Sequence, residues 1–168
     1  AIPLNRIVKR FIDLVCVTLG SLLVSPILLL ISLAVFLDSP GPVFFGHERV
    51  GRDGKFFKAW KFRTMIPNAQ QRLEAYLKQH PELELEWRET QKLQNDPRVT
   101  RIGKILRKYS LDEFPQLWNV FVGEMSLVGP RPCTPNEFDH YEPWQRQRVN
   151  CLPGLTGYWQ VNGKNKTT

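Results

Sequence analysis

Residues 11–37 read FIDLVCVTLGSLLVSPILLLISLAVFL, and only Asp13 carries a charge within this stretch. At about 20 residues per bilayer crossing, the stretch is long enough for one membrane-spanning helix. Pro26 lies near its middle, however, and a proline inside a helix removes a backbone hydrogen bond and favours a kink. The two arms, residues 11–24 and 27–37, are each short for a full crossing. The Ser25 hydroxyl is placed to satisfy a carbonyl that the bend frees.

Basic residues flank this apolar stretch on both sides. Three precede it and six follow closely, namely Arg6, Lys9 and Arg10, then Arg49, Arg52, Lys55, Lys58, Lys61 and Arg63. Because cytoplasmic flanks carry the excess of Lys and Arg, both ends are expected in the cytoplasm, which one straight crossing does not allow. Residues 1–38 are therefore predicted to form a re-entrant membrane helix broken at Ser25-Pro26. A single spanning helix with a proline kink is the alternative, and a signal peptide is disfavoured because no A-x-A cleavage site follows.

The composition is that of one folded domain with an anionic partner. The chain has 168 residues, of which 42% are hydrophobic and 23% charged, so a wholly disordered chain is excluded. The 23 Lys and Arg against 16 Asp and Glu give a net charge of +7, which favours nucleic acid, an acidic membrane surface or phosphorylated substrates as partners. The three cysteines show neither zinc-ligand nor disulfide-framework spacing, and a reducing, cytosol-facing environment fits.

Residues 39–168 are predicted to form the remaining domain, which makes the fold class α+β and mostly helical. Residues 43–65, divided by the turn signal Arg52-Asp53-Gly54, predict a short β-hairpin. Residues 68–95 predict a solvated helical hairpin divided by Pro81. Residues 99–109 have apolar positions at helical spacing among basic ones, which favours an amphipathic helix on anionic lipid, with packing on the core as the alternative. The Gly- and Pro-rich part from residue 120 onward predicts short helices and constrained loops.

The clearest candidate for chemistry is Ser110-Leu111-Asp112-Glu113. Ser110 and Glu113 match an S-x-x-E capping box, and spacing alone favours this structural interpretation. The functional interpretation uses the same geometry, since a carboxylate in the first turn of a helix and near Arg107 is held ionised, as a nucleophilic aspartate must be. Asp112 and Glu113 together also form a candidate Mg²⁺ site.

Further basic residues are candidate phosphate ligands. Arg131 lies between two prolines, so its guanidinium is pre-organised for a diphosphate, although a turn arginine paired with a structural carboxylate is an equal alternative. Lys61 and Arg63 are phosphate ligands or simply strand surface charges. No role is assigned to His47, His80 and His140, which share no motif spacing. The aromatic residues that could stack on a base or sugar, but are more typical of a core, are Trp144, Tyr158 and Trp159.

These motifs together resemble the bacterial sugar transferases, the monotopic polyprenol-phosphate phosphoglycosyl transferases, and most of all the undecaprenyl-phosphate hexose-1-phosphate transferases. The resemblance covers nearly the whole chain and includes the Ser25-Pro26 break, DSPGPVFF, ERVGRDGKFFKAWKFRTM, DPRVTRIGKILRKYSLDEFPQLWNV, GEMSLVGPRP and PGLTGYWQV. It implies transfer of a sugar 1-phosphate from a UDP-sugar to polyprenol phosphate, with release of UMP. This reaction is the first membrane step in the synthesis of bacterial surface glycans such as exopolysaccharide or O-antigen, at the cytoplasmic face of the inner membrane.

The resemblance also implies roles for single residues. Asp112 would be the nucleophile that forms a covalent aspartyl-phosphosugar, Glu113 would complete the dyad, and Mg²⁺ would neutralise the diphosphate. Arg107 and Arg131 would match phosphate- and nucleotide-handling arginines. Residues 68–94 are longer than in the smallest members and look more like those that transfer galactose or glucose 1-phosphate. Since family members usually continue past the end of this chain, a fragment is expected.

Other functions stay open at this point. A non-catalytic membrane adaptor would use the basic face to bind anionic lipid, and a metal-dependent phosphodiesterase would use water in place of polyprenol phosphate. Nucleic acid is disfavoured as a partner because of the apolar anchor and the central carboxylate pair. The identity of the sugar and the oligomeric state, a homo-oligomer included, are not encoded in these motifs.

Overall fold

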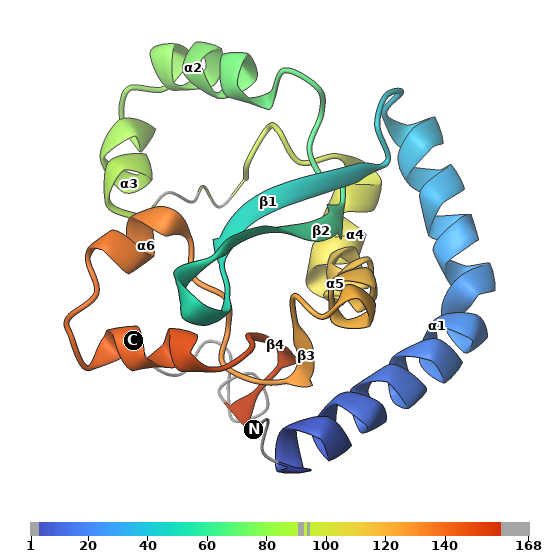
Figure 1. Ribbon diagram of the computed structural model, residues 1–168. Coiled ribbons are helices and arrows are strands. Elements are labelled where there is room, and N and C mark those ends of the chain that lie inside the picture. The colour runs from blue at the N-terminus through green and yellow to red at the C-terminus, as the bar shows by residue number, and fades with distance from the viewer. Residues whose placement is uncertain (1–3, 91–92, 94, 159–168) are drawn as a thin grey trace.

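The computed structural model describes residues 4–90, 93 and 95–158, and the order of its elements is shown in Figure 1. The elements, with 3-10 helices labelled η, are α1 (Leu4–Asp38), β1 (Phe44–Val50), η1 (Arg52–Gly54), β2 (Phe56–Phe62), α2 (Ala69–Gln79), α3 (Leu83–Thr90), α4 (Arg101–Lys108), η2 (Leu111–Glu113), α5 (Gln116–Val122), β3 (Ser126–Val128), α6 (Pro135–Asp139), η3 (Gln145–Asn150) and β4 (Gly154–Thr156). Helices therefore predominate over two small sheets, which confirms the predicted mostly helical α+β class.

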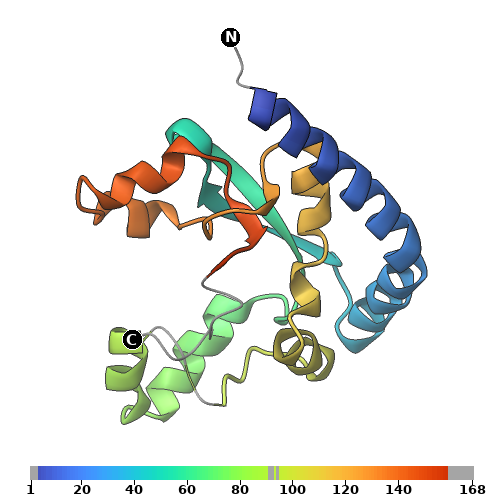
Figure 2. The ribbon, with the colours of Figure 1, turned by 90° about the horizontal axis from the view of Figure 1, so that it is seen from below.

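The apolar N-terminal stretch forms one helix, α1, of 35 residues that continues through Pro26. Figures 1 and 2 both show α1 curving around the rest of the domain. The predicted break at Ser25-Pro26 is therefore wrong as a break. Pro26 has no N–H for the Leu22 carbonyl, and the Ser25 hydroxyl donates to that carbonyl at 2.8 Å, so the helix bends without ending. By length and composition α1 is apolar enough to cross a membrane.

Polar side chains fix the first turns of α1 to the domain. Asp13 is only 4% exposed. Its carboxylate accepts hydrogen bonds from the Ser126 hydroxyl at 2.7 Å and the Leu127 amide at 3.2 Å. Lys9 lies 3.3 Å from the same carboxylate and also donates to Ser126. Arg10 donates to two carbonyls at the C-terminal end of α5, at 2.6 and 2.8 Å.

The other end of α1 is attached to the same domain. The Asp38 carboxylate accepts from the backbone amide of Ile102 at 2.9 Å, at the start of α4. Arg63, just after β2, donates to the carbonyl of Ser39. Two apolar clusters follow the same pattern, since Val17 packs with residues of β2 and α5 and Val35 packs with Phe62 and Leu106. The helix thus contributes to the core at two separate places, at Val17 in its N-terminal half and at Val35 near its C-terminal end.

The predicted β-hairpin is confirmed. Strands β1 and β2 pair antiparallel from Phe44 opposite Phe62 to Val50 opposite Phe56, and the turn lies at η1 as expected. Within the turn, Asp53 and Gly54 adopt positive φ angles of 58° and 75°, which aspartate and glycine tolerate. A second, parallel pair joins β3 to β4.

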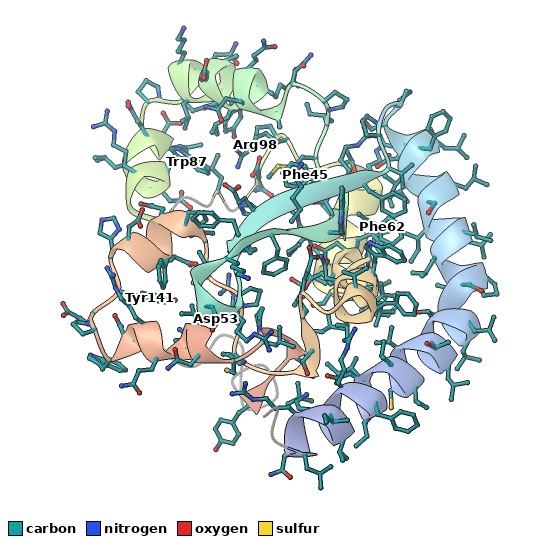
Figure 3. All side chains as sticks on the ribbon, viewed as in Figure 1. Phe45, Asp53, Phe62, Trp87, Arg98 and Tyr141 are labelled. Carbon is teal, nitrogen blue, oxygen red and sulfur yellow. The ribbon has the colours of Figure 1, made fainter. Side chains whose placement is uncertain are left out.

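The helical pair divided by Pro81 is also confirmed, as α2 and α3. Trp87 of α3 stacks on the guanidinium of Arg98 at 4.7 Å (Figure 3). Arg98 in turn pairs with Asp96 at 2.6 Å, and both side chains are largely buried. The hairpin of α2 and α3 is therefore attached to the segment that leads into α4.

The amphipathic helix predicted for residues 99–109 forms α4, but its apolar face packs mainly on protein. Leu106 is 3% exposed and contacts Val35 and Phe62. Only Ile105 and Tyr109, at 52% and 62% exposed, remain available to a lipid surface. The centre of the apolar face thus follows the alternative, packing on the core, because α1 and β2 bury it, and contact of the exposed part with anionic lipid stays a prediction.

Candidate active site

Asp112 and Glu113 occupy a single 3-10 turn, η2, directly after α4. Ser110 adopts a left-handed conformation with φ 55° and ψ 24°, so the chain turns sharply between the two elements. The predicted capping box is wrong. Within the described residues the Ser110 side chain makes no capping hydrogen bond, and the Glu113 carboxylate is held by Lys61 instead.

Lys61 of β2 bridges the two carboxylates. Its ammonium nitrogen lies 2.7 Å from Oε1 of Glu113 and 3.9 Å from Oδ2 of Asp112. The hairpin register places Lys61 opposite Phe45, close to the open end of β1 and β2 and far in sequence from η2. The fold therefore brings a lysine from the hairpin to the carboxylate dyad.

The electrostatic setting of Asp112 differs from the expectation. Burial raises its pKa, and the neighbouring Glu113 charge raises it further, while the charges of Lys61 and Arg107 lower it. The net result is a pKa above the ordinary value of an aspartate. The predicted stabilisation of the ionised form by a helix terminus is wrong, because η2 is one short turn and burial at 9% exposure dominates.

Arg107 is the second basic residue brought to Asp112. Its Nε donates to the Thr64 hydroxyl at 2.9 Å. Thr64 is placed there because its carbonyl accepts from the Thr100 amide at 3.0 Å, which joins the end of β2 to the start of α4. Burial lowers the pKa of Arg107, whereas the negative charges of Asp112 and Asp96 raise it. Arg107 thus lies within electrostatic reach of the dyad, as predicted.

Arg63 makes a structural contact, and its prediction as a phosphate ligand stays a prediction. It donates to the Ser39 carbonyl and so joins the end of β2 to the end of α1. Its Nε and Nη1 have no hydrogen-bond partner among the described residues. No described contact links Arg63 to Asp112 or Glu113.

Arg131 lies on the exposed segment after β3, near a part of the site that the sequence analysis missed. The Val50 amide donates to the Cys133 carbonyl at 2.9 Å, which holds this segment beside the end of β1. The missed residues are Arg49 and His47, both on β1. The Nη2 of Arg49 lies 3.2 Å from Nδ1 of His47, and Arg49 is 9% exposed.

The pairing register contains the signal that could have revealed these two residues. In an antiparallel pair, directly opposed residues share a face of the sheet, and that face is repeated at every second residue. His47 is opposite Ala59 and Arg49 is opposite Phe57. On β2, Phe57, Ala59 and Lys61 follow one another at every second residue and so lie on the same face. His47, Arg49 and Lys61 therefore share one face, and this face also carries the buried Ala59 and Phe57. An arginine on such a face is unusual enough to mark a site.

The charges of this cluster act on one another. Burial lowers the pKa of Arg49 and the Arg131 charge lowers it further, while the carboxylates of Glu137 and Glu113 raise it. Burial also lowers the pKa of His47, and so do the charges of Arg49 and Lys61. The site therefore combines two carboxylates with basic side chains of β1, β2, α4 and the segment after β3, whose charges act on one another.

The metal-binding capacity of the site is limited to the dyad. The described residues contain no group of three or more His, Cys, Asp or Glu side chains that could hold an ion. Two adjacent carboxylates nevertheless match Mg²⁺, which is commonly held by one or two carboxylates together with substrate phosphates. The donor set fits a metal shared with a diphosphate and not one enclosed by protein alone.

Trp144 and Tyr158, two of the three aromatic residues considered for stacking, are not in a core. Trp144 is 71% exposed and Tyr158 is 84% exposed, so the expectation of core packing is wrong for these two. Trp159 lies outside the described residues.

Comparison with known proteins gives a consistent result. The sequence profile of a family described as bacterial sugar transferase matches residues 4–168. Over 163 residues the chain is 46% identical to the exopolysaccharide production protein ExoY of Rhizobium meliloti, covering 97% of this chain and 72% of that protein.

Two other relatives are longer. Over 161 residues the chain is 44% identical to the undecaprenyl-phosphate galactose phosphotransferase of Salmonella typhimurium, covering 96% of this chain and 34% of the relative. Over 165 residues it is 45% identical to the UDP-glucose:undecaprenyl-phosphate glucose-1-phosphate transferase of Escherichia coli, covering 95% and 32%. The chain thus spans about a third of the length of these two proteins.

Proposed function

Because this chain belongs to the bacterial sugar transferase family, we propose that it transfers a sugar 1-phosphate from a UDP-sugar to undecaprenyl phosphate and releases UMP. Two of its relatives are named for transfers of this kind, with galactose and glucose respectively. The observation that carries the proposal is the buried Asp112 beside Glu113, bridged by Lys61, in a domain built onto a long apolar helix. Both substrates are anionic, which suits the basic surface around the dyad.

The reaction proceeds in two displacements at Asp112. An oxygen of its carboxylate attacks the β-phosphorus, the bond to the oxygen that bridges both phosphates breaks, and UMP leaves with that electron pair. A phosphate oxygen of undecaprenyl phosphate then attacks the same phosphorus and releases the Asp112 carboxylate. The product is a lipid diphosphate sugar. Two steps allow UMP to leave before the lipid phosphate enters, so that one small site serves both substrates.

The neighbouring residues prepare the nucleophile and the phosphates. Burial favours the neutral form of Asp112, and the Lys61 ammonium favours the ionised form that attacks. Arg107 and Lys61 are placed to offset the charge of the phosphoryl group during transfer. Mg²⁺, held by Asp112 and Glu113 together with phosphate oxygens, would supply further neutralisation of the diphosphate.

The same proposal includes a re-entrant course for α1. A helix of this length would extend about 50 Å if straight, far more than a single bilayer core requires. Its first turns are fixed to α5 and β3, and its last turn is fixed to α4 and β2. A straight crossing would separate these two ends by the whole bilayer, whereas a helix that enters and returns leaves both beside one domain. The substrate phosphate of the lipid then lies at headgroup depth, near the dyad.

The course of α1 is tested by labelling single cysteines in intact spheroplasts. The native Cys16 and Cys151 are exposed and are replaced by serine, and Cys133 is buried and is retained. Asn5→Cys and Lys55→Cys place thiols on either side of the helix. Both are expected to be protected from a membrane-impermeant maleimide and to react after permeabilisation. Reaction of Asn5→Cys alone in intact cells would show a spanning helix.

The chemistry is tested by UMP release from several UDP-sugars, with and without undecaprenyl phosphate. The wild type is expected to release about one UMP per chain without the lipid and to turn over repeatedly with it. Asp112→Asn should release none, and Asp53→Asn, an exposed acid in the hairpin turn, should behave as wild type. Mass spectrometry should detect a sugar-phosphate adduct on Asp112. Continuous UMP release without lipid would indicate a phosphodiesterase, and normal behaviour of Asp112→Asn would indicate a non-catalytic adaptor.

A further inference from the structure

Arg49 is a buried arginine with an unused donor. The residue is 9% exposed, and its Nη1 has no hydrogen-bond partner among the described residues. The nearest acid is Glu137 of α6, with Oε2 at 3.9 Å from Nη1, which is beyond hydrogen-bond distance. A buried charged donor without an acceptor is costly, so its presence in a folded domain indicates an acceptor that arrives from outside.

The groups around Arg49 are committed elsewhere. Oε2 of Glu137 already accepts from the backbone amide of Thr134 at 2.7 Å, within the capping box of α6. Nη2 of Arg49 is directed at Nδ1 of His47, which accepts when the neutral ring carries its proton on Nε2. The contact with His47 orients the guanidinium, and the commitment of Glu137 to Thr134 leaves Nη1 as the donor available to a ligand.

The charge distribution specifies the kind of acceptor. Arg131 lies close enough to lower the pKa of Arg49, after burial itself, so the two guanidinium groups repel each other. A dianionic phosphate offers several oxygens and relieves this repulsion, because each guanidinium can donate to a different oxygen. Glu137 and Glu113 offset the repulsion only in part, since Glu113 is itself paired with Lys61 at 2.7 Å.

The position of Arg49 relative to the dyad indicates which phosphate it meets. The charges that act on Asp112 are those of Lys61, Glu113 and Arg107. Those that act on Arg49 include Arg131, Glu137 and Glu113. In the hairpin register Arg49 shares a face with Lys61, which pairs with Glu113, and lies two positions along that face beyond it, with His47 between them. Arg49 is therefore farther from the nucleophile than Lys61, on the side where Lys61 meets Glu113.

We propose that Arg49 binds the α-phosphate of the nucleotide, the phosphate that departs with UMP, through Nη1, and that His47 positions the guanidinium. This inference rests on the proposed function, since it assumes that the β-phosphorus is the one at Asp112. Arg131, whose charge acts on Arg49, completes the subsite. Arg49 is thus a substrate-binding residue, and His47 acts through it.

Binding of UMP to the full chain in lipid nanodiscs, measured by titration calorimetry, tests the proposal without requiring turnover. Arg49→Met, which keeps the length and removes the donors, should raise the dissociation constant of UMP at least tenfold. Arg49→Lys should give an intermediate value. Uridine, which lacks the phosphate, should bind the wild type and both variants equally. Arg52→Met is the matched control, because Arg52 is an exposed arginine of the same hairpin that pairs with Asp53 at 3.5 Å.

Several results would overturn the proposal. These are unchanged UMP affinity in Arg49→Met, an equal loss of uridine and UMP affinity, or a wild type that binds no UMP. If Arg49→Met does not fold, as judged by thermal melting, the comparison of Arg49→Lys with wild type decides. Failure of the proposed function gives a different pattern, in which UMP binding depends on Arg49 but no UDP-sugar yields UMP. Normal transfer with UMP affinity independent of Arg49 would refute this inference alone.

Discussion

Asp13 offers the sharpest test of how α1 is built into the domain. It is a buried carboxylate in an otherwise apolar helix, and it accepts from Ser126 at 2.7 Å and from the Leu127 amide at 3.2 Å. Lys9 completes the group at 3.3 Å. Asp13→Ala removes both carboxylate oxygens that accept these hydrogen bonds. It leaves the Leu127 amide without this hydrogen-bond partner.

The magnitude follows from these contacts. Breaking a buried ion pair by removing one partner costs about 3–5 kcal/mol. The Lys9 side chain is 51% exposed and can be rehydrated, so the lower end, about 3 kcal/mol, applies here. For a domain of this size, about 1 kcal/mol shifts the melting temperature by about 2–4 °C, so Asp13→Ala should melt about 6–12 °C lower. Asp13→Asn keeps one acceptor and should lose less than half of this.

The assay is thermal unfolding of the detergent-solubilised chain followed by circular dichroism. Glu74→Ala, which removes an exposed acid of α2, serves as the control and should melt within about 1 °C of wild type, since surface changes are worth about 0.5 kcal/mol or less. Equal melting temperatures for Asp13→Ala and Glu74→Ala would refute the claim that this carboxylate fixes α1 to β3.

Three further outcomes are expected. Lys61→Met should lower kcat/KM for UMP release by about 10²–10³-fold, as expected for the loss of one preorganised charge at a reacting phosphate. Lys58→Met, on the opposite face of β2, should leave kcat/KM unchanged. Equal kcat/KM values for the two variants would show that Lys61 does not act in the reaction. Leu106→Ala should destabilise the domain by about 3 kcal/mol, against about 0.5 kcal/mol or less for the exposed Ile105→Ala, as measured by melting temperature; similar losses would contradict the packing of α4. The pKa of His47 is lowered from its ordinary 6.5 by burial and by Arg49 and Lys61, against an opposing effect of Glu137, so the unfolded chain takes up this proton first as the pH falls. The contribution of neutral His47 to the free energy of unfolding should therefore be fully present above pH 6.5 and decrease below it. The urea midpoints of wild type and His47→Asn measure this contribution. A difference between the two midpoints that is the same at pH 7.5 and pH 5.5 would contradict the prediction.

Local sequence patterns predict correctly those elements that are determined by a few neighbouring residues. The turn signal at Arg52-Asp53-Gly54 and the proline at Pro81 each act within a few residues, and the hairpin and the helical pair formed where they were predicted. The same is true of Ser25, whose hydroxyl reaches a carbonyl three residues earlier. The sequence predicts a break at Pro26, but this one replacement hydrogen bond accompanies a helix that stays continuous.

The candidate site depends on contacts between segments that are distant in the sequence, and local sequence patterns do not predict such contacts. Asp112 and Glu113 were identified from their neighbours, but the Lys61 bridge joins residues 52 positions apart in the chain. The capping-box prediction failed because this distant lysine holds Glu113, and because Ser110 takes a left-handed conformation that the spacing does not reveal. The sequence analysis assigns Arg49 no role in the site. Its importance follows from its burial, which depends on the packing of β1 against segments far along the chain.

The attachment of α1 at both ends has a consequence for the catalytic domain. Val17 and Val35 complete two apolar clusters whose other buried members lie in β2, α4, α5 and, for Met125, directly before β3. Deleting the helix to obtain a water-soluble enzyme, or exchanging it for a generic anchor, would leave both clusters open. The catalytic domain therefore requires the helix as one of its own core elements, in addition to any role the helix has as an anchor.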